Sequence, residues 1–462
     1  MNVKFKKKKY NIIETINIIL MIFLFQPSES LIEIPIYLSH KEDADIDENN
    51  DKTNNKNNLT TFLEEGLVQK NSQDLLLAYI KLGSNSQKFK LILDTGSQIT
   101  WVADAHNTIG GLSETTNVFN PSSSTTCLPL YQSFKIEYGI GYCSGYYYID
   151  TMKYFNEQAF KIKFGVAQVA NFDFSNADGI LGLARTNRDL TTSFIIMSYN
   201  AKITDSKLFS FKFATYNFNI PIGKLYIGRH KDFSKRHAFS CDLLDDTYKN
   251  LIFWTCELNA FGIYNIYNNI YSTKKTPIIF DTGTNFIILP YFYLEEMKDH
   301  LKNVGCRVIK YESANKENGN DEQYRLVCQS NNLPEFQFGL GKTKFIIPTS
   351  LTFFKKGQLA YSYIIFVKTI SNQEPYVFGT PFFLSFHTLF NEDDKKLEFY
   401  PLDNDYIINN LFKYIIIIST ITLIISISIG VYFVYRKNEK KKVVSTEYKS
   451  IISNDIEMTN KL

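Results

Sequence analysis

Short apolar runs separated by turn residues fill the chain from residue 74 onward. The runs are rich in aromatic and β-branched side chains, as in FKLILDTG, FKIKFGVAQV and PYVFGTP, with Gly, Pro, Asn or Ser between them. Runs of this kind are typical of β-strands. One segment, residues 291–304, instead places its apolar side chains at helical spacing. The pattern predicts a mostly β protein with few helices.

Residues 1–30 have a different pattern, with a basic cluster, an apolar stretch and small residues at the end. This three-part layout is typical of a secretory signal peptide. Glu14 and Asn17 interrupt the start of the apolar stretch, so an uncleaved anchor is the alternative. A signal peptide would direct the body of the chain into the secretory pathway.

A second long apolar run extends from Tyr414 to Tyr435 without a charged side chain. At ~1.5 Å per residue, a helix of this length covers a hydrocarbon core of ~30 Å, so the run predicts one transmembrane helix. Basic side chains follow from Arg436 onward, against Lys413 on the other side, and the positive-inside rule therefore places the C-terminus in the cytosol. We expect a single-pass type I membrane protein with a lumenal or extracellular body.

The transmembrane prediction assigns roles to the segments on either side of residues 414–435. Residues 404–413 form a linker, and residues 436–462 form a cytosolic tail. In that tail, Tyr448 opens the sequence YKSI, which has the form of a tyrosine-based sorting signal. A sorting adaptor is therefore a candidate partner, although four-residue patterns of this kind are common by chance.

Residues 31–73 are rich in Asn, Asp, Lys and Glu and hold too little apolar surface to order themselves alone. This low-complexity tract, with a glycosylation sequon at Asn58, is either a spacer or a removable prosegment. The whole chain has a formal net charge of +3, and basic excess is concentrated in the two terminal segments. The body carries no broad basic face, so we expect no nucleic-acid partner.

The six cysteines are even in number and form no CxxC motif, which in an oxidising compartment predicts disulfides. Pairing of neighbours along the sequence suggests Cys127–Cys143, Cys241–Cys256 and Cys306–Cys328. Other connectivities stay open. The histidines are scattered and no HExxH motif occurs, so we expect no metal site.

An internal repeat divides the body in two. The runs KLILDTGS (Lys90–Ser97) and PIIFDTGT (Pro277–Thr284) contain the same Asp-Thr-Gly tripeptide. Each is followed, after a similar interval, by two hydrophobic residues and a glycine, at 180–182 and at 377–379. Self-similarity on this scale predicts two related lobes.

The repeated tripeptide indicates a pair of carboxylates. An Asp at the end of a strand can be held rigidly, because a Gly two residues later permits a tight turn and offers its N–H to the carboxylate. Two such loops facing each other would bring Asp94 and Asp281 together. Like charges at short range cannot both ionise, so the pair would share one proton. One carboxylate could then activate a water while the other protonates the carbonyl under attack, without a metal or cofactor.

Further motifs surround the two loops in a characteristic order. They are Trp101, YGIG at 138–141, ADGILGLA at 177–184 and VFGTPFFLSFHTLFN at 377–391. Together with the loops, this set resembles the pepsin-type aspartic proteases over nearly all of residues 74–403. The Asn-, Ile- and Lys-rich composition is similar to that of the plasmepsin branch.

The resemblance implies a fold, an activity and a partner. The fold would be mostly β and bilobal, with an active-site cleft between two pseudo-symmetric lobes, residues 74–214 and residues 215–403. The activity would be that of an aspartic endopeptidase without a cofactor. The partner would be an extended polypeptide substrate held by backbone hydrogen bonds, with apolar pockets beside the scissile bond.

The resemblance also implies roles for individual residues. Asp94 and Asp281 would be the catalytic pair. The supporting residues would be Thr95 and Thr282 across the lobe boundary, Ser97 and Thr284 at the outer carboxylate oxygens, and Gly96 and Gly283 through their N–H groups. Tyr138 and Gly139 would lie on a hairpin flap over the substrate, with the Tyr138 hydroxyl near the indole of Trp101.

Three positions depart from the family pattern. Ile140 stands where relatives usually carry a flap hydroxyl or acid, Gln98 replaces a small residue and Asn391 replaces an Asp. We expect these changes to alter specificity more than chemistry. Ile140 also keeps an alternative open, a catalytically inactive pepsin-fold protein that binds peptides or a partner. Because residues 31–73 are more acidic than basic, their removal by another protease stays open beside self-removal.

Overall fold

The computed structural model describes residues 32–38, 75–105, 117–138, 141–153, 159–170, 177–186, 189–213, 223–230, 239–245, 247–248, 251–264, 270–311, 322–368 and 376–401, with Tyr432 and Arg436. Residue contacts divide the chain into one unit from Met1 to Pro401 and another from Leu402 to Leu462. The expected signal peptide, linker and sorting motif lie outside the described residues, as do the expected membrane span and tail apart from Tyr432 and Arg436. Within the described ranges, no helix is long and apolar enough to cross a membrane.

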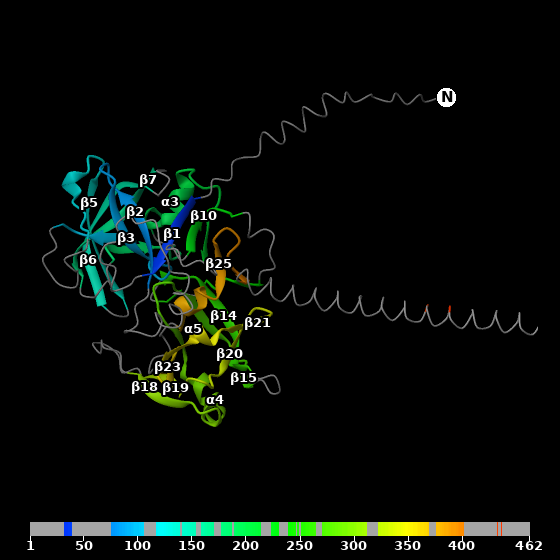
Figure 1. Ribbon diagram of the computed structural model, residues 1–462. Helices are drawn as coiled ribbons and strands as arrows, with labels where there is room; N and C mark the ends of the chain where they lie inside the picture. Colours follow the sequence, from blue (N-terminus) through cyan, green and yellow to red (C-terminus); the bar gives the residue numbers. More distant parts are fainter. Residues whose placement is uncertain are drawn as a thin grey trace, which may run out of the picture. The chain divides into compact units, whose positions relative to one another are not determined.

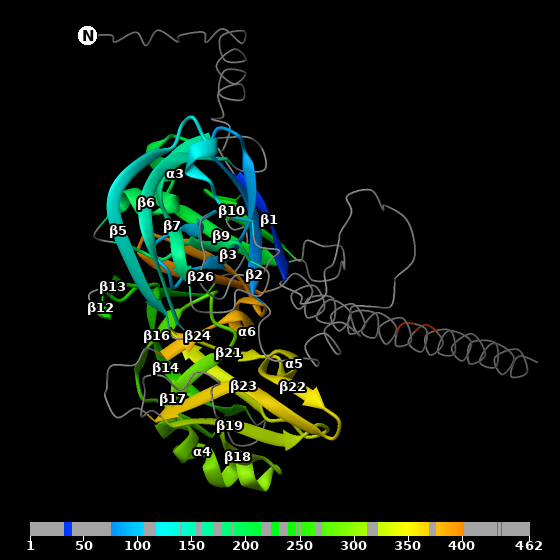
Figure 2. The same cartoon turned by 90° about the vertical axis from the view of Figure 1, so that its left-hand side faces the viewer.

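Two large sheets make up the first unit (Figures 1 and 2). The 13-stranded sheet has, in order across it, β11 (Phe239–Asp242), β26 (Lys396–Pro401), β25 (Phe386–Asn391), β9 (Leu208–Phe213), β10 (Gly223–Ile227), β1 (Ile32–Leu38), β2 (Leu76–Leu82), β3 (Gln87–Asp94), β8 (Gly179–Gly182), β4 (Trp101–Ala103), β7 (Ala159–Ala170), β6 (Gly141–Lys153) and β5 (Leu128–Tyr138).

The 11-stranded sheet has, in order, β18 (Arg307–Tyr311), β19 (Glu322–Gln329), β23 (Leu359–Lys368), β17 (Ile287–Pro290), β24 (Tyr376–Phe378), β16 (Thr276–Phe280), β14 (Thr255–Tyr264), β20 (Glu335–Leu340) and β21 (Thr343–Ile347). Two more strands pair at its side, β15 (Ile270–Ser272) with β14 and β22 (Phe353–Lys356) with β23. The remaining elements are β12 (Thr247–Tyr248), β13 (Leu251–Ile252), the 3-10 helices η2 (Pro121–Ser123) and η3 (Leu190–Thr192), and the helices α3 (Phe194–Asn200), α4 (Tyr291–Asn303), α5 (Thr349–Thr352) and α6 (Thr380–Phe383).

The mostly β architecture expected from the sequence is confirmed, and the described part of the chain builds it from two large sheets and the two-stranded sheet of β12 and β13. The sheets do not divide the chain at a single point. Strands β25 and β26, from the C-terminal end of the body, pair with β9 in the first sheet, for example Leu389 opposite Ser210. The expected boundary between residues 214 and 215 therefore separates the two repeats, while strands from both sides of it share the first sheet.

Strand β1 lies in the segment expected to be low-complexity. Its alternating pattern places Ile32, Ile34 and Ile36 on one face, and all three are fully buried. The strand pairs antiparallel with β10 and, at its end, with β2. Residues 32–38 are therefore ordered in the folded protein, because a neighbouring sheet supplies the buried surface that this tract was expected to lack alone.

The internal repeat appears as two copies of one three-stranded arrangement. In the first copy, β8 lies parallel to β3 and antiparallel to β4. In the second copy, β24 lies parallel to β16 and antiparallel to β17. The glycine that ends residues 377–379 lets its strand approach the backbone of the loop, because a Cβ on Gly379 would lie 2.1 Å from the carbonyl oxygen of Thr284. The repeated sequence thus forms a repeated structure.

Helix α4 confirms the helix expected at residues 291–304. Its buried side chains follow a helical period, with Tyr293, Leu294, Met297 and Leu301 on the face that packs against the second sheet. His300 and Lys302 lie in its last turn, where positive charge interacts favourably with the helix dipole. Figure 2 shows α4 beside β18 and β19.

Aromatic side chains pack behind the second Asp-Thr-Gly loop. Phe280, which precedes Asp281, packs edge-on against Phe378 and Phe382 with ring centroids 5.5 and 5.1 Å apart. It also stacks on Phe399 of β26 at 5.3 Å. Phe399 belongs to the first sheet, so this cluster joins the two sheets at the base of the loop.

Two of the three expected disulfides are present. Cys241 of β11 is bonded to Cys256 of β14. Cys306, just after α4, is bonded to Cys328 of β19. The first disulfide links a strand of each large sheet, and the second ties α4 to the sheet that it covers.

The expected pair Cys127–Cys143 is wrong, because both residues are free thiols. Cys127 precedes Leu128, which lies opposite Ile149, whereas Cys143 lies opposite Ile136. At about 3.3 Å per residue, this register separates the two cysteines by roughly 20 Å along the hairpin, far beyond the ~5.5 Å between the Cα atoms of a disulfide. Burial raises the pKa of each thiol to about 12, so both stay protonated.

Candidate active site

Each expected catalytic aspartate lies at the C-terminal end of a strand of the repeat. Asp94 ends β3, and Asp281 follows β16. The backbone of each is held by the neighbouring parallel strand: the Leu183 N–H donates to the Asp94 carbonyl at 2.8 Å, and the Asp281 N–H donates to the Phe378 carbonyl at 3.0 Å. The two loops therefore have the same structural origin.

The threonines of the two loops hydrogen-bond to each other across the repeat. The N–H of Thr95 donates to the Thr282 hydroxyl at 3.1 Å, and the N–H of Thr282 donates to the Thr95 hydroxyl at 2.9 Å. Each hydroxyl also donates to a carbonyl of the opposite strand, Thr95 to Phe280 at 2.8 Å and Thr282 to Leu93 at 2.6 Å. Both threonines are fully buried, so this network holds the loops together without competition from water.

Each carboxylate receives the same two local hydrogen bonds. The Gly96 N–H donates to Asp94 Oδ1 at 2.8 Å, and the Ser97 hydroxyl donates to Oδ2 at 2.5 Å. In the other loop, the Gly283 N–H donates to Asp281 Oδ1 at 2.8 Å, and the Thr284 hydroxyl donates to Oδ2 at 2.7 Å. These donors orient the carboxyl planes.

The glycines place the two carboxyl groups next to each other. A Cβ on Gly96 would lie 2.8 Å from Cγ of Asp281, and a Cβ on Gly283 would lie 2.8 Å from Cγ of Asp94. Burial, followed by the charge of Asp281, raises the pKa of Asp94 well above its ordinary value, whereas the Ser97 and Gly96 hydrogen bonds oppose this shift. The protonated form of Asp94 is therefore favoured beside Asp281.

Comparison with known proteins identifies the family. The family model described as eukaryotic aspartyl protease matches residues 76–402. The chain belongs to this family.

Relatives from several organisms match more than half of the chain. Gastricsin of Mus musculus is 24% identical over 337 residues, which cover 70% of this chain and 79% of that protein. Gastricsin of Oryctolagus cuniculus is 26% identical over 332 residues, covering 70% and 80%. Vacuolar protease A of Aspergillus fumigatus is 27% identical over 280 residues, covering 58% and 64%. The pepsin-like family expected from the motifs is thus confirmed.

The hairpin of β5 and β6 carries the tyrosine expected on the flap of this aspartyl protease. Tyr138 ends β5, and its hydroxyl accepts a hydrogen bond from the buried indole N–H of Trp101 at 2.8 Å, as the resemblance implies. Burial, the Cys143 thiol and Asp94 raise the pKa of Tyr138 well above its ordinary value, so the hydroxyl stays neutral. Gly139 and Ile140 lie outside the described residues.

Two positions that depart from the family pattern have identifiable contacts. Asn391 is fully buried at the turn after β25, where it donates to the Asp394 carboxylate at 2.9 Å and accepts from the Asp394 N–H at 2.8 Å. Its role there is to close the turn. Gln98 donates from its side-chain amide to the carbonyl of Arg185 at 2.7 Å.

Sequence reasoning missed Arg185 and Trp254. Trp254 lies before β14 and donates from its indole N–H to the Leu183 carbonyl at 2.9 Å. Arg185 is buried beside it. The sequence does show that a charged residue, Arg185, directly follows the motif ADGILGLA. Its partners could not be predicted, because they are distant in the sequence.

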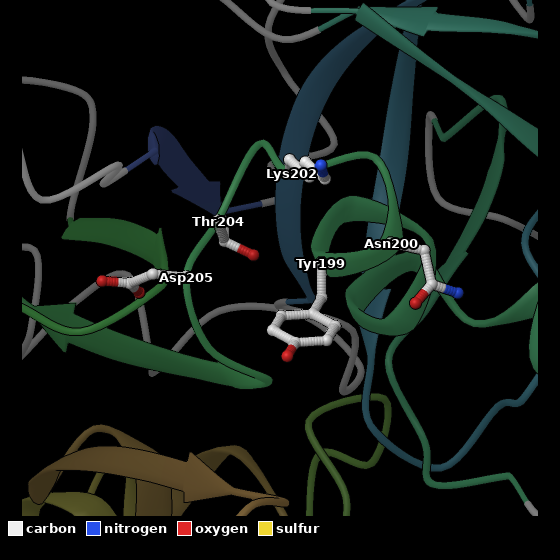
Figure 3. Close-up of a pocket in the computed structure, with 5 residues that line it drawn as sticks. All are labelled: Tyr199, Asn200, Lys202, Thr204 and Asp205. Carbon is white, nitrogen blue, oxygen red and sulfur yellow. The ribbon is translucent and has the colours of Figure 1, made fainter.

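Figure 3 shows a surface pocket of about 520 Å³ that lies apart from the two loops in the sequence. It is lined by residues at the end of α3 and just after it, namely Tyr199, Asn200, Lys202, Thr204 and Asp205. None of these belongs to the loops that hold Asp94 and Asp281. In the part of the chain that the structure describes, no group of three or more His, Cys, Asp or Glu side chains could hold a metal ion.

Proposed function

We propose that this aspartyl protease family member is an active endopeptidase that hydrolyses peptide bonds with a water activated between Asp94 and Asp281. The observation that carries the proposal is the mutual placement of the two carboxyl groups. Each lies against the glycine of the opposite loop, and the pKa of Asp94 is raised by burial and by Asp281. A pair with one proton can supply an acid and a base in the same step.

In the proposed reaction, the ionised carboxylate removes a proton from a bound water as the water oxygen attacks the peptide carbonyl carbon. The protonated carboxyl donates its proton to the carbonyl oxygen, which gives a neutral tetrahedral intermediate. The dyad then gives its proton to the amide nitrogen, and one hydroxyl of the intermediate returns a proton to the dyad as the C–N bond breaks. The products are a carboxylic acid and an amine, and the pair again holds a single proton. The Gly96, Ser97, Gly283 and Thr284 donors keep the carboxyl planes oriented throughout.

The proposed substrate is an extended polypeptide that passes between the two loops and the β5–β6 hairpin. The hydrogen bond from Trp101 to Tyr138 holds the tyrosine hydroxyl at the end of that hairpin. Main-chain hydrogen bonds to the hairpin would supply affinity, and side-chain pockets would supply selectivity. The departure at Ile140 is expected to change which side chains are preferred.

Cleavage of a peptide library by the purified region of residues 31–403 at about pH 5 tests the proposal. We expect cleavage that a statine-type inhibitor abolishes, because its hydroxyl occupies the position of the activated water between the carboxyl groups. Cleavage-site profiling in the same experiment identifies the preferred side chains. Absence of inhibitor-sensitive cleavage, together with retained peptide binding, would favour the alternative of an inactive binding protein.

Membrane anchoring and transport are a second part of the proposal, supported by the sequence alone. Residues 1–30 act as a signal peptide, residues 414–435 anchor the chain, and Tyr448 recruits a sorting adaptor in the cytosolic tail. The proposed assignment to the plasmepsin type rests in the same way on the sequence, through its Asn-, Ile- and Lys-rich composition and short prosegment. Protease protection of the intact chain in microsomes tests the topology: a protected body with a digestible tail is expected, and a digestible body would contradict it.

Removal of residues 31–73 as a prosegment is a third part of the proposal. Its support is the composition of the tract and its position directly before the aspartyl protease region. Expression of wild type and of Asp94→Asn, followed by N-terminal sequencing, tests how it is removed. A shortened form in both proteins would indicate another protease, and a shortened form in wild type alone would indicate self-removal.

A further inference from the structure

Arg185 follows β8 and places its guanidinium in the interior, with only 2% of the side chain exposed. Its Nε donates to Glu392 at 2.9 Å, in the turn after β25. The contact of Nη2 with Asp245 is longer, at 3.4 Å, and that carboxylate is 87% exposed. A buried guanidinium needs a close carboxylate, so Glu392 is the partner that matters for its charge.

The guanidinium also covers Trp254. Its central carbon lies 5.8 Å from the indole centroid, and Nη1 donates to the Phe253 carbonyl at 3.4 Å. A planar guanidinium can combine such contacts with an ion pair, which a lysine ammonium cannot do in the same geometry. Arg185 therefore fixes the segment that contains Phe253 and Trp254 against the turn at Glu392.

The backbone around Arg185 is tied to the Asp94 loop. The Gln98 side chain donates to the Arg185 carbonyl at 2.7 Å, and the Ala184 N–H donates to the Ser97 carbonyl at 3.0 Å. Ser97 is the residue whose hydroxyl orients Asp94. A shift of residues 184–185 would therefore move the support of the Asp94 carboxylate.

Trp254 carries the connection to the Asp281 loop. Its indole donates to the Leu183 carbonyl at 2.9 Å, and its own carbonyl accepts from the Phe280 N–H at 2.8 Å. Phe280 directly precedes Asp281. Leu183, Trp254 and Phe280 thus join the two loops by a route separate from the hydrogen bonds between Thr95 and Thr282.

We propose that Arg185 is a positioning residue that keeps the Asp94 and Asp281 loops in register by fixing Trp254 between them. The expected effect of Arg185 on catalysis rests on the proposed function. The threonines hold the loops at their first turns, whereas Arg185 and Trp254 hold the strands and turns behind them. A change of about 1 Å in the placement of reacting groups is enough to slow an enzyme about 100-fold.

The test compares Arg185→Gln with Arg325→Gln. Arg325 is a matched control, because its guanidinium also lies over aromatic rings, Phe354 at 5.0 Å and Tyr361 at 5.5 Å, within the second sheet. For Arg185→Gln we expect kcat to fall about 10- to 100-fold with KM within about twofold, and Glu392→Gln should act in the same direction. Arg325→Gln should lower thermal stability and leave kcat within about twofold. An unchanged kcat in folded Arg185→Gln would overturn the proposal.

A second measurement does not depend on activity. Hydrogen–deuterium exchange at the Leu183 and Phe280 amides reports the local stability of the strands behind the two loops. We expect both to exchange at least about tenfold faster in Arg185→Gln than in Arg325→Gln at matched stability. Equal exchange in the two variants would contradict the positioning role.

The two measurements also separate this inference from the proposed function. If wild type shows no inhibitor-sensitive cleavage, the proposed function fails, while exchange at Leu183 and Phe280 still decides whether Arg185 positions the loops. If wild type is active but both readouts are unchanged in Arg185→Gln, the inference fails and the proposed function stands. Faster exchange together with a fall in kcat supports both.

Discussion

The two halves of the site share one backbone design but differ in their surroundings. The Asp94 and Asp281 loops receive equivalent hydrogen bonds from a glycine, a hydroxyl and the opposite threonine. Asp94 is only 6% exposed, whereas Asp281 is half-buried. The repeated tripeptide therefore determines the loop geometry, and the neighbouring elements determine how far each carboxyl is buried.

The difference extends to the residues that follow each loop. Trp101 pairs with Ile180 on β8, and Ile288 pairs with Val377 at the corresponding place on β24. Of Trp101 and Ile288, only the tryptophan has a side-chain donor, and it donates to the hydroxyl of Tyr138. Similarly, Arg185 stands three residues after Gly182, and the core residue Phe382 stands three residues after Gly379. The symmetry therefore holds for the two loops that carry Asp94 and Asp281, and it is absent at the contact between Trp101 and Tyr138.

The largest expected effect comes from removing either carboxylate. Asp94→Asn and Asp281→Asn should each lower kcat by about 1,000-fold or more, because an acid–base pair needs both members. The effects should agree within about tenfold despite the difference in burial. Steady-state kinetics on a peptide substrate measures this, with Asp205→Asn as an exposed control. Substantial activity in one of the two variants would show that the halves do not act as one site.

The pH dependence of stability tests the burial of Asp94 in the first half of the site. The pKa of Asp94 is raised above its ordinary value of 3.8, so the folded state favours the protonated form. Its contribution to stability is therefore complete below about pH 3.8 and is lost as pH rises through the folded pKa. Asp94→Asn cannot ionise and should become more stable than wild type as pH increases.

Urea unfolding across a pH series checks this expectation, with Asp205→Asn as the control that follows wild type. If the free energies of unfolding of wild type and Asp94→Asn change equally from acid to neutral pH, then ionisation of Asp94 does not destabilise the folded protein and the expectation is wrong.

Disulfide removal tests the second half of the chain, residues 215–403, which holds all four cysteines of the two described disulfides. Cys241→Ala/Cys256→Ala and Cys306→Ala/Cys328→Ala should each reduce the free energy of unfolding by about 3 kcal/mol, given separations of 15 and 22 residues. Cys127→Ala, which removes a free thiol, should cost less than about 1 kcal/mol. Chemical denaturation measures all three. An equal loss in Cys127→Ala would show that the first half depends on Cys127 in a way its free thiol does not explain.

The smallest expected effects test the hydrogen bonds between the two loops at Thr95 and Thr282. Thr95→Val and Thr282→Val each leave buried N–H and carbonyl groups without a partner, which should cost about 1–3 kcal/mol. The two losses should be equal, and Thr→Ser at either position should recover most of the stability. A clear inequality measured by thermal unfolding would show that the cross-loop network is not symmetric.

Much of the site could be predicted because its geometry is local. In each Asp-Thr-Gly sequence, the aspartate, the glycine N–H and the following hydroxyl lie within four residues, so the tripeptide itself specifies their hydrogen bonds. Helix α4 was predictable for a similar reason, since its buried face repeats at helical spacing.

Other features depended on which strands pair. Cys127 and Cys143 are consecutive cysteines along the sequence, but the register of β5 and β6 places them far apart along the hairpin. Strand β1 belongs to a polar tract, yet β10 and β2 supply the surface that buries its isoleucines. The pairing of β1 with β10 joins residues that are distant along the chain, whereas β5 and β6 form a local hairpin whose register sets the distance between its cysteines.

The sequence by itself determined the carboxylate pair, the family and the mostly β architecture, because repeated motifs encode local backbone geometry and hydrophobic pattern. Only the tertiary structure decided the burial of Asp94, the free state of Cys127 and Cys143, and the path from Arg185 through Trp254 to Phe280. The free thiols follow from the register of the β5–β6 hairpin. The burial of Asp94 and the path from Arg185 depend on contacts between segments far apart in the chain, whose relative placement results from the packing of both sheets together.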